Sequence, residues 1–196
     1  MIKLRDVYTR SNLLSLTRLL LSVPVYFLLF RIEDSANYRI EIIAVLIFAA
    51  ATDFLDGYLA RKYNEISEAG KILDPLADKV LVGVVTIQLF VLGEIPPVYF
   101  FSVIGRDLII FLGGIYVTKR LGKVLPSNLL GKITVTFIAA YLLSIILGVT
   151  DSVPFLYDLF YYVSLILVYG SLIAYIIRAK ESLTWNKNES VQEHQL

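Results

Sequence analysis

The chain has 196 residues, of which 57% are hydrophobic, and its mean hydropathy is +0.72. An ordinary soluble domain does not contain so many long apolar runs, so the composition predicts an all-α integral membrane protein. The formal net charge of +1 decides nothing, and we expect no nucleic-acid partner for such a chain. The lack of Cys together with a single His, His194, excludes disulfides, thiolate metal sites and Ser-His-Asp or Cys-His catalysis.

The predicted elements follow one another with short connections. Residues 1–12 mix apolar and basic positions, which favours a short helix lying along the membrane interface. Six apolar runs follow, and each can cross about 30 Å of hydrocarbon as a helix. They cover residues 13–30, 41–59, 76–92, 97–117, 129–149 and 153–177. We predict one domain of six transmembrane helices, residues 1–180, and a polar, disordered C-terminal tail, residues 181–196.

The basic residues indicate an orientation. All but three of the 18 Lys and Arg residues fall on one side of the predicted spans; Arg31 and Arg39 fall on the other side, and Arg106 lies within a span. Short loops rich in Lys and Arg stay in the cytoplasm. We therefore expect both termini and any active site on the cytoplasmic side of the cytoplasmic (inner) membrane.

The end of the second span carries two carboxylates on one helical face. Asp53, Asp56, Gly57 and Ala60 are spaced i, i+3, i+4 and i+7, so they share that face. Two of the four positions have almost no side chain, and there a phosphate or nucleotide can approach the helix backbone.

The third span adds two more carboxylates at the same end. Asp74 precedes Pro75, which predicts an N-cap followed by proline at the first helical position, and Asp78 follows one turn later. Any one Asp here could be an interfacial cap. Four together would repel one another unless cations neutralised them. Two Mg²⁺ ions suit such oxygen ligands and would support in-line attack at phosphorus.

The same residues match a known signature. The spacing D-x2-D-G-x2-A-R-x8-G-x3-D-x3-D, from residue 53 to residue 78, resembles that of the CDP-alcohol phosphatidyltransferases at every fixed position. The resemblance implies a six-helix, dimeric membrane enzyme that transfers a phosphatidyl or similar group from a CDP-linked donor, such as CDP-diacylglycerol, to an alcohol and releases CMP.

The resemblance also implies roles for individual residues. The four Asp residues would ligate two Mg²⁺ or Mn²⁺ ions, and Asp78 would in addition be the catalytic base on the acceptor hydroxyl. The donor would be bound by residues of the signature and of an upstream stretch similar to N-x-L-T-x-x-R, namely Asn12, Ser15, Arg18, Gly57, Ala60, Arg61 and Gly70. For Asn12, Ser15 and Arg18, a helix cap followed by an interfacial Arg is an equally open interpretation.

The acceptor is indicated less directly. The stretches GKILDPLADK and LLGKIT resemble phosphatidylglycerophosphate synthases, whose acceptor is glycerol 3-phosphate. Arg106 within the fourth span, Lys132 and Arg178 could hold a phosphate; an ion pair of Arg106 with Asp107, and snorkelling of Lys132, are the alternatives.

Two departures keep other acceptors open. Gly114 and Ile138 stand where those synthases usually carry Arg and Gln. Inositol phosphate, serine and phosphatidylglycerol therefore remain alternative acceptors.

Two other classes of membrane protein fit the sequence less well. A cation channel or transporter would favour ionisable groups at the membrane midplane or paired broken helices in two halves of the chain. Here the carboxylates cluster at one end of the predicted spans, and the sequence has no visible internal repeat. A structural membrane protein would leave Arg61, Gly70 and the four Asp residues unexplained.

Overall fold

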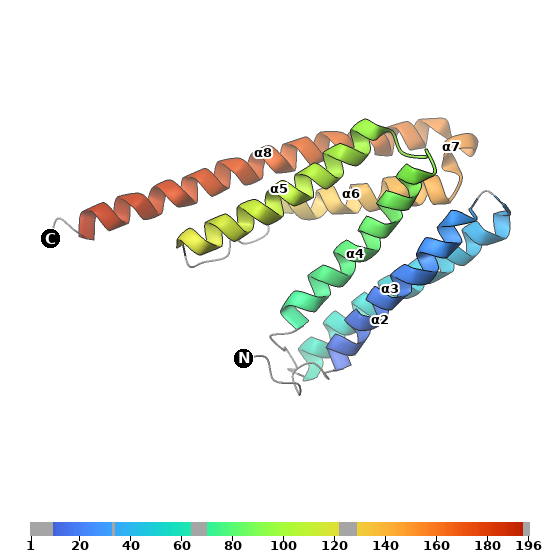
Figure 1. Ribbon diagram of the computed structural model, residues 1–196, viewed down its shortest axis with the longest axis horizontal. Coiled ribbons are helices and arrows are strands. Elements are labelled where there is room, and N and C mark those ends of the chain that lie inside the picture. The colour runs from blue at the N-terminus through green and yellow to red at the C-terminus, as the bar shows by residue number, and fades with distance from the viewer. Residues whose placement is uncertain (1–9, 33, 64–69, 122–128, 194–196) are drawn as a thin grey trace. The chain divides into compact units, whose positions relative to one another are not determined.

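A computed structural model describes residues 10–32, 34–63, 70–121 and 129–193, with the backbone alone at 10–13, 36, 56–63, 70–76, 78, 151 and 185–193. Every regular element in these ranges is a helix, which confirms the all-α prediction (Figure 1). The helices are α2 (Arg10–Phe30), α3 (Ala36–Tyr63), α4 (Gly70–Val91), α5 (Pro97–Leu121), α6 (Leu129–Ile146), α7 (Val149–Ser152) and α8 (Pro154–Glu193). The six long helices lie where the six spans were predicted, and α7 is a single turn.

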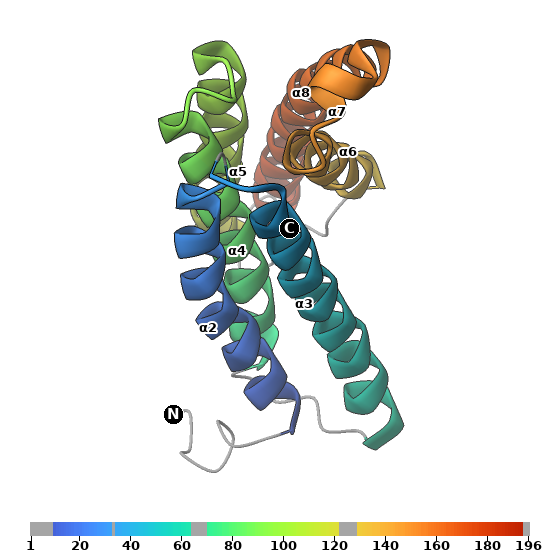
Figure 2. The same cartoon turned by 90° about the vertical axis from the view of Figure 1, so that its right-hand side faces the viewer.

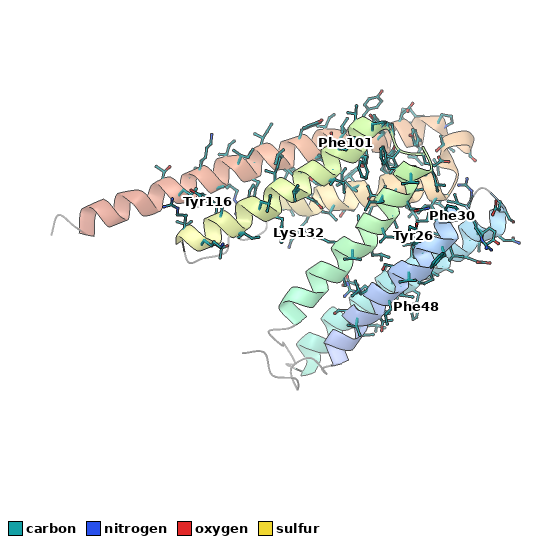
Figure 3. The ribbon with its side chains drawn as sticks, in the orientation of Figure 1. Tyr26, Phe30, Phe48, Phe101, Tyr116 and Lys132 are labelled. Atoms are coloured by element: carbon teal, nitrogen blue, oxygen red, sulfur yellow. The ribbon has the colours of Figure 1, made fainter. Side chains whose placement is uncertain are left out.

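The helices have the character of a membrane protein. Three are long and apolar enough to cross a bilayer by length and composition, namely Pro97–Leu121, Leu129–Ile146 and Pro154–Thr184, and two shorter apolar helices cover Leu14–Phe30 and Lys79–Val91. Large apolar side chains such as Phe30, Phe48, Phe101 and Tyr116 are more than half exposed (Figure 3). Lipid is the solvent that suits such surfaces, and the protein is an integral membrane protein.

Two helix boundaries differ from the sequence prediction. Helix α4 begins at Gly70, so Asp74 is not its N-cap and Pro75 is not its first residue. Pro75 is the sixth residue of α4, so it removes one N–H that would otherwise bond the carbonyl of Lys71. Lys71, Ile72 and Leu73 are compatible with the earlier turn.

The C-terminal segment differs as well. Helix α8 continues to Glu193, although we expected disorder after Lys180. Residues 181–193 contain no Gly or Pro to end the helix.

The chain forms two compact units. Unit 1 comprises the described residues up to Ile95 and the segment Ile146–Gly148; unit 2 comprises those of Pro96–Ile145 and of the chain from Val149 onward. In unit 1, α2 packs against both α3 and α4 (Figure 2). Val25, Leu29, Ile42 and Leu89 are fully buried. The donor side of the predicted site therefore belongs to unit 1.

Helix α4 ends in a glycine-dependent cap. Gly93 has a φ of 83°, its N–H donates to the carbonyl of Phe90 at 3.0 Å, and the N–H of Glu94 donates to the carbonyl of Leu89 at 2.9 Å. This is a Schellman motif, in which a left-handed residue satisfies the last helical carbonyls. It explains why α4 stops just before the Pro96-Pro97 pair.

In unit 2, α5 and α8 run side by side in the same direction (Figure 1). Tyr99 donates its hydroxyl hydrogen to Ser164 Oγ at 2.9 Å, and one turn later the hydroxyls of Ser102 and Tyr169 lie 2.7 Å apart. The partners are 65 and 67 residues apart in sequence, so the register is nearly constant along both helices. We call this line of polar contacts, which continues through Arg106 with Ser171, the α5–α8 seam.

Toward the C-terminal ends of α5 and α8, the seam continues as a close approach between a glycine and an aromatic ring. A Cβ added at Gly113 would lie 3.0 Å from Cε1 and 3.1 Å from the hydroxyl oxygen of Tyr175, whereas one at Gly114 would lie 3.6 Å from that oxygen. Contacts at 3.0 Å are too short for ordinary packing. Gly113 therefore lets the Tyr175 ring approach the α5 backbone.

Candidate active site

Two residues predicted to bind donor and metal meet between α2 and α3. Arg18 Nη1 lies 2.7 Å from Asp53 Oδ1. Arg18 is 1% exposed and is the largest fully buried side chain among the described residues, while the Asp53 side chain is 55% exposed. Ser15, one turn before Arg18 on the same face of α2, is also fully buried. The upstream stretch and the signature are thus joined in space.

This ion pair has a clear electrostatic meaning. A buried guanidinium requires an anionic or hydrogen-bonding partner to offset its lost hydration, and Asp53 supplies one. Because more than half of the Asp53 side chain stays accessible, the carboxylate can contact Arg18 and still face an ion in solution. Oxygen donors of this kind fit Mg²⁺ and Mn²⁺. The described part of the site is therefore compatible with the predicted metals.

The other predicted residues of this region are known only by backbone position. Asp56, Gly57, Ala60 and Arg61 lie in the last turns of α3, Asn12 lies in the first turn of α2, and Gly70, Asp74 and Asp78 lie in the first turns of α4. Their side chains are outside the described part of the chain, so the convergence of four carboxylates stays a prediction. Among the side chains that are described, no three acidic or His groups gather closely enough to hold a metal ion.

Arg106, the predicted acceptor residue in α5, is held by two partners in unit 2. Its Nε donates to Ser171 Oγ at 3.2 Å, and its Nη1 donates to Asp107 Oδ1 at 2.5 Å. The residue is 7% exposed. The ion pair with Asp107 considered from the sequence does form, and it engages only one edge of the guanidinium.

The two remaining acceptor candidates also belong to unit 2. Lys132 is exposed near the start of α6 (Figure 3). Arg178 is partly buried on α8, seven residues beyond Ser171, or about 10 Å along the helix. The donor residues lie in unit 1 and these three lie in unit 2.

One residue of this region was not found from the sequence. Ser171 contacts Arg106, but a serine in an apolar helix is unremarkable by itself. A faint signal exists, because Ser164 and Ser171 are seven residues apart on α8, as are their partners Tyr99 and Arg106 on α5. The spacing produces contacts only because α5 and α8 pack against each other in this register.

Comparison with known proteins identifies the family. A sequence model described as CDP-alcohol phosphatidyltransferase matches residues 8–177. A CDP-diacylglycerol--glycerol-3-phosphate 3-phosphatidyltransferase of Aquifex aeolicus is 41% identical over 172 residues, which cover 85% of this chain and 93% of the relative. One of the same name from Rickettsia typhi is 36% identical over 137 residues, 69% of this chain and 74% of the relative.

A relative with another name matches less of its own length. A cardiolipin synthase (CMP-forming) of Rattus norvegicus is 37% identical over 114 residues, 58% of this chain and 36% of the relative. The family match covers most of the chain and includes all of the signature and most of each unit. The chain therefore belongs to the CDP-alcohol phosphatidyltransferase family and is a membrane-embedded transferase of phospholipid synthesis.

Proposed function

We propose that this enzyme transfers the phosphatidyl group of CDP-diacylglycerol to glycerol 3-phosphate, giving phosphatidylglycerophosphate and CMP. The observation that carries the proposal is the 41% identity, over 85% of this chain and 93% of the relative, to the Aquifex aeolicus protein of that name. The buried Arg106, with N–H groups left for a further partner, supports a phosphorylated acceptor.

Residues of both units take part in the proposed reaction. Asp53, Asp56, Asp74 and Asp78 would hold two Mg²⁺ or Mn²⁺ ions, which would neutralise the donor diphosphate and supply Lewis-acid chemistry at the phosphorus under attack. Asn12, Ser15 and Arg18 border the donor phosphates, while Gly57, Ala60, Arg61 and Gly70 contact the CDP moiety.

The transfer step is a single displacement at phosphorus. Asp78 removes the proton of the acceptor hydroxyl, and the resulting oxygen attacks the lipid-side phosphorus of the donor. The bond from that phosphorus to CMP breaks, CMP leaves with its electron pair, and Asp78 returns the proton to solvent. Arg106, Lys132 and Arg178 hold the acceptor phosphate during this step.

An acceptor panel tests the substrate. Purified enzyme is given CDP-diacylglycerol and, in turn, glycerol 3-phosphate, inositol phosphate, serine and phosphatidylglycerol, and CMP release is measured. We expect the highest kcat/KM with glycerol 3-phosphate. Phosphatidylglycerol is the second candidate because of the likeness to the cardiolipin synthase. A higher kcat/KM with any of the other three would refute the assignment of glycerol 3-phosphate and leave the reaction class intact.

We also propose that the enzyme lies in the cytoplasmic membrane with both termini and the active site on the cytoplasmic side. The asymmetry of the basic residues supports this orientation. A fluorescent protein that matures only in the cytoplasm, fused after Leu196, should be bright, and an alkaline phosphatase fused there should be inactive. The reverse pattern contradicts the orientation.

The enzyme is further proposed to act as a homodimer, as the family resemblance implies. Light scattering of the detergent-solubilised protein measures the protein mass of the particle. The mass of a single chain at working concentration would contradict the dimer.

A further inference from the structure

The guanidinium of Arg106 is only partly paired. A guanidinium has five N–H donors. One at Nε points to Ser171 and one at Nη1 points to Asp107, and the other three have no hydrogen-bond partner among the described residues. The Arg106 side chain is 8% exposed, so these donors are largely withdrawn from water. Buried N–H donors that carry a positive charge and have no partner favour the binding of an anion.

Ser171 is fixed in the orientation that Arg106 requires. Its hydroxyl hydrogen is donated to the carbonyl of Val168 at 3.0 Å, which leaves a lone pair of Oγ to accept the Arg106 Nε–H at 3.2 Å. Ser171 is 2% exposed, so water does not compete for that lone pair. The serine therefore acts as a single, directed acceptor on the Nε edge.

Asp107 by itself does not fix the orientation of the Arg106 guanidinium. It is the next residue along α5, its side chain is 38% exposed, and it contacts Nη1 only. A one-point contact at Nη1 leaves the guanidinium able to rotate about that contact. The second contact, from a different helix at Nε, fixes the plane of the guanidinium and leaves three N–H donors of the two Nη groups for a further partner.

We propose that Ser171 is a positioning residue: it orients Arg106 so that the free Nη edge meets the phosphate of the acceptor. The proposal rests on the assignment of Arg106 to acceptor binding made above. Loss of the Ser171 hydroxyl leaves the charge of Arg106 in place but removes its fixed direction, so a bidentate contact with phosphate forms less often. The donor, bound by residues of unit 1, is not affected.

The seam provides a matched control. Ser164 lies two turns earlier on α8, is fully buried, accepts the Tyr99 O–H at 2.9 Å and donates to the carbonyl of Tyr161 at 3.0 Å. Ser164→Ala and Ser171→Ala thus remove the same atom from the same kind of interhelical contact, and only one of those contacts involves a charged residue. Ser171→Thr keeps the hydroxyl and serves as the conservative variant.

The experiment measures KM for glycerol 3-phosphate, KM for CDP-diacylglycerol, kcat and the melting temperature of the intact enzyme in detergent. We expect Ser171→Ala to raise KM for glycerol 3-phosphate roughly tenfold, with kcat and the donor KM within about twofold of wild type. Ser164→Ala should change the melting temperature by a similar amount and leave all three kinetic constants near wild type. Ser171→Thr should recover most of the acceptor affinity.

The outcomes separate this inference from the proposed function. If Ser171→Ala and Ser164→Ala have the same acceptor KM while Arg106→Ala raises it strongly, Arg106 binds the acceptor but Ser171 does not position it. An unchanged acceptor KM in Arg106→Ala overturns both the acceptor role of Arg106 and the positioning role. If wild type uses serine and not glycerol 3-phosphate, the proposed acceptor is wrong, and the positioning role toward a phosphate is overturned with it.

Discussion

Excess EDTA is expected to abolish CMP release by the purified enzyme, and Mg²⁺ or Mn²⁺ added back above the chelator is expected to restore it. The predicted site gathers four carboxylates, and the donor adds a diphosphate. The repulsion energy between unscreened carboxylates a few ångströms apart is on the order of several kcal/mol. The described cation nearest to Asp53 is Arg18, and a single guanidinium balances only one of those negative charges. We therefore expect divalent cations to balance the remaining negative charges.

The metal experiment has a second readout that does not depend on turnover. Binding of CDP-diacylglycerol, measured by filtration or by quenching of a labelled donor, should weaken with the chelator in parallel with activity. Full activity in a preparation shown by elemental analysis to contain no divalent metal would contradict the two-ion proposal. It would not affect the family assignment, which rests on the sequence match.

Asp78→Asn should lower kcat by about 10²-fold or more, the usual scale for loss of a general base, while the donor still binds. Asparagine keeps the size and one metal-capable oxygen of the side chain, but it cannot accept the acceptor proton. The backbone of Asp78 lies on α4 one turn beyond Asp74, and from this spacing we propose that it contacts both a metal ion and the acceptor hydroxyl. The measurement is kcat and donor affinity across a titration with Mg²⁺.

Asp53→Asn provides the contrast. That substitution removes charge from a proposed metal ligand and from the carboxylate that Arg18 contacts at 2.7 Å, so donor and metal binding should weaken together. If saturating Mg²⁺ returns Asp78→Asn to near wild-type turnover, Asp78 is a ligand only. The proton then passes to water or to Asp74.

The placement of the long helices could be predicted because apolar runs of membrane length have few alternatives. The start of α4 could not, since the Asp74-Pro75 pair has the residues of a helix start although the helix begins at Gly70. Local preference competes there with continuation of the helix, and the continuation is stronger. The disorder expected after Lys180 was wrong for a related reason, because polarity alone does not end a helix that contains no Gly or Pro.

Some residues of the candidate site could likewise be predicted from the sequence, and others could not. The signature from Asp53 to Asp78 is local in sequence, so spacing alone was enough to predict it. Arg18 and Asp53 were each predicted from a separate motif, but the ion pair between them was not predicted. Ser171 could not be predicted, because its contact with Arg106 depends on the register of α8 against α5. That register is set by contacts between side chains about 65 residues apart in sequence.

That separation also fixes the order in which Arg106 acquires its partners during synthesis. Ribosomes add about 5 to 20 residues per second, so Ser171 is made about 3 to 13 seconds after Arg106. Asp107 is the next residue and is available at once. During this interval only Asp107, of the two described partners, has been synthesised. Its carboxylate is therefore the partner available to the Arg106 guanidinium until α8 is made.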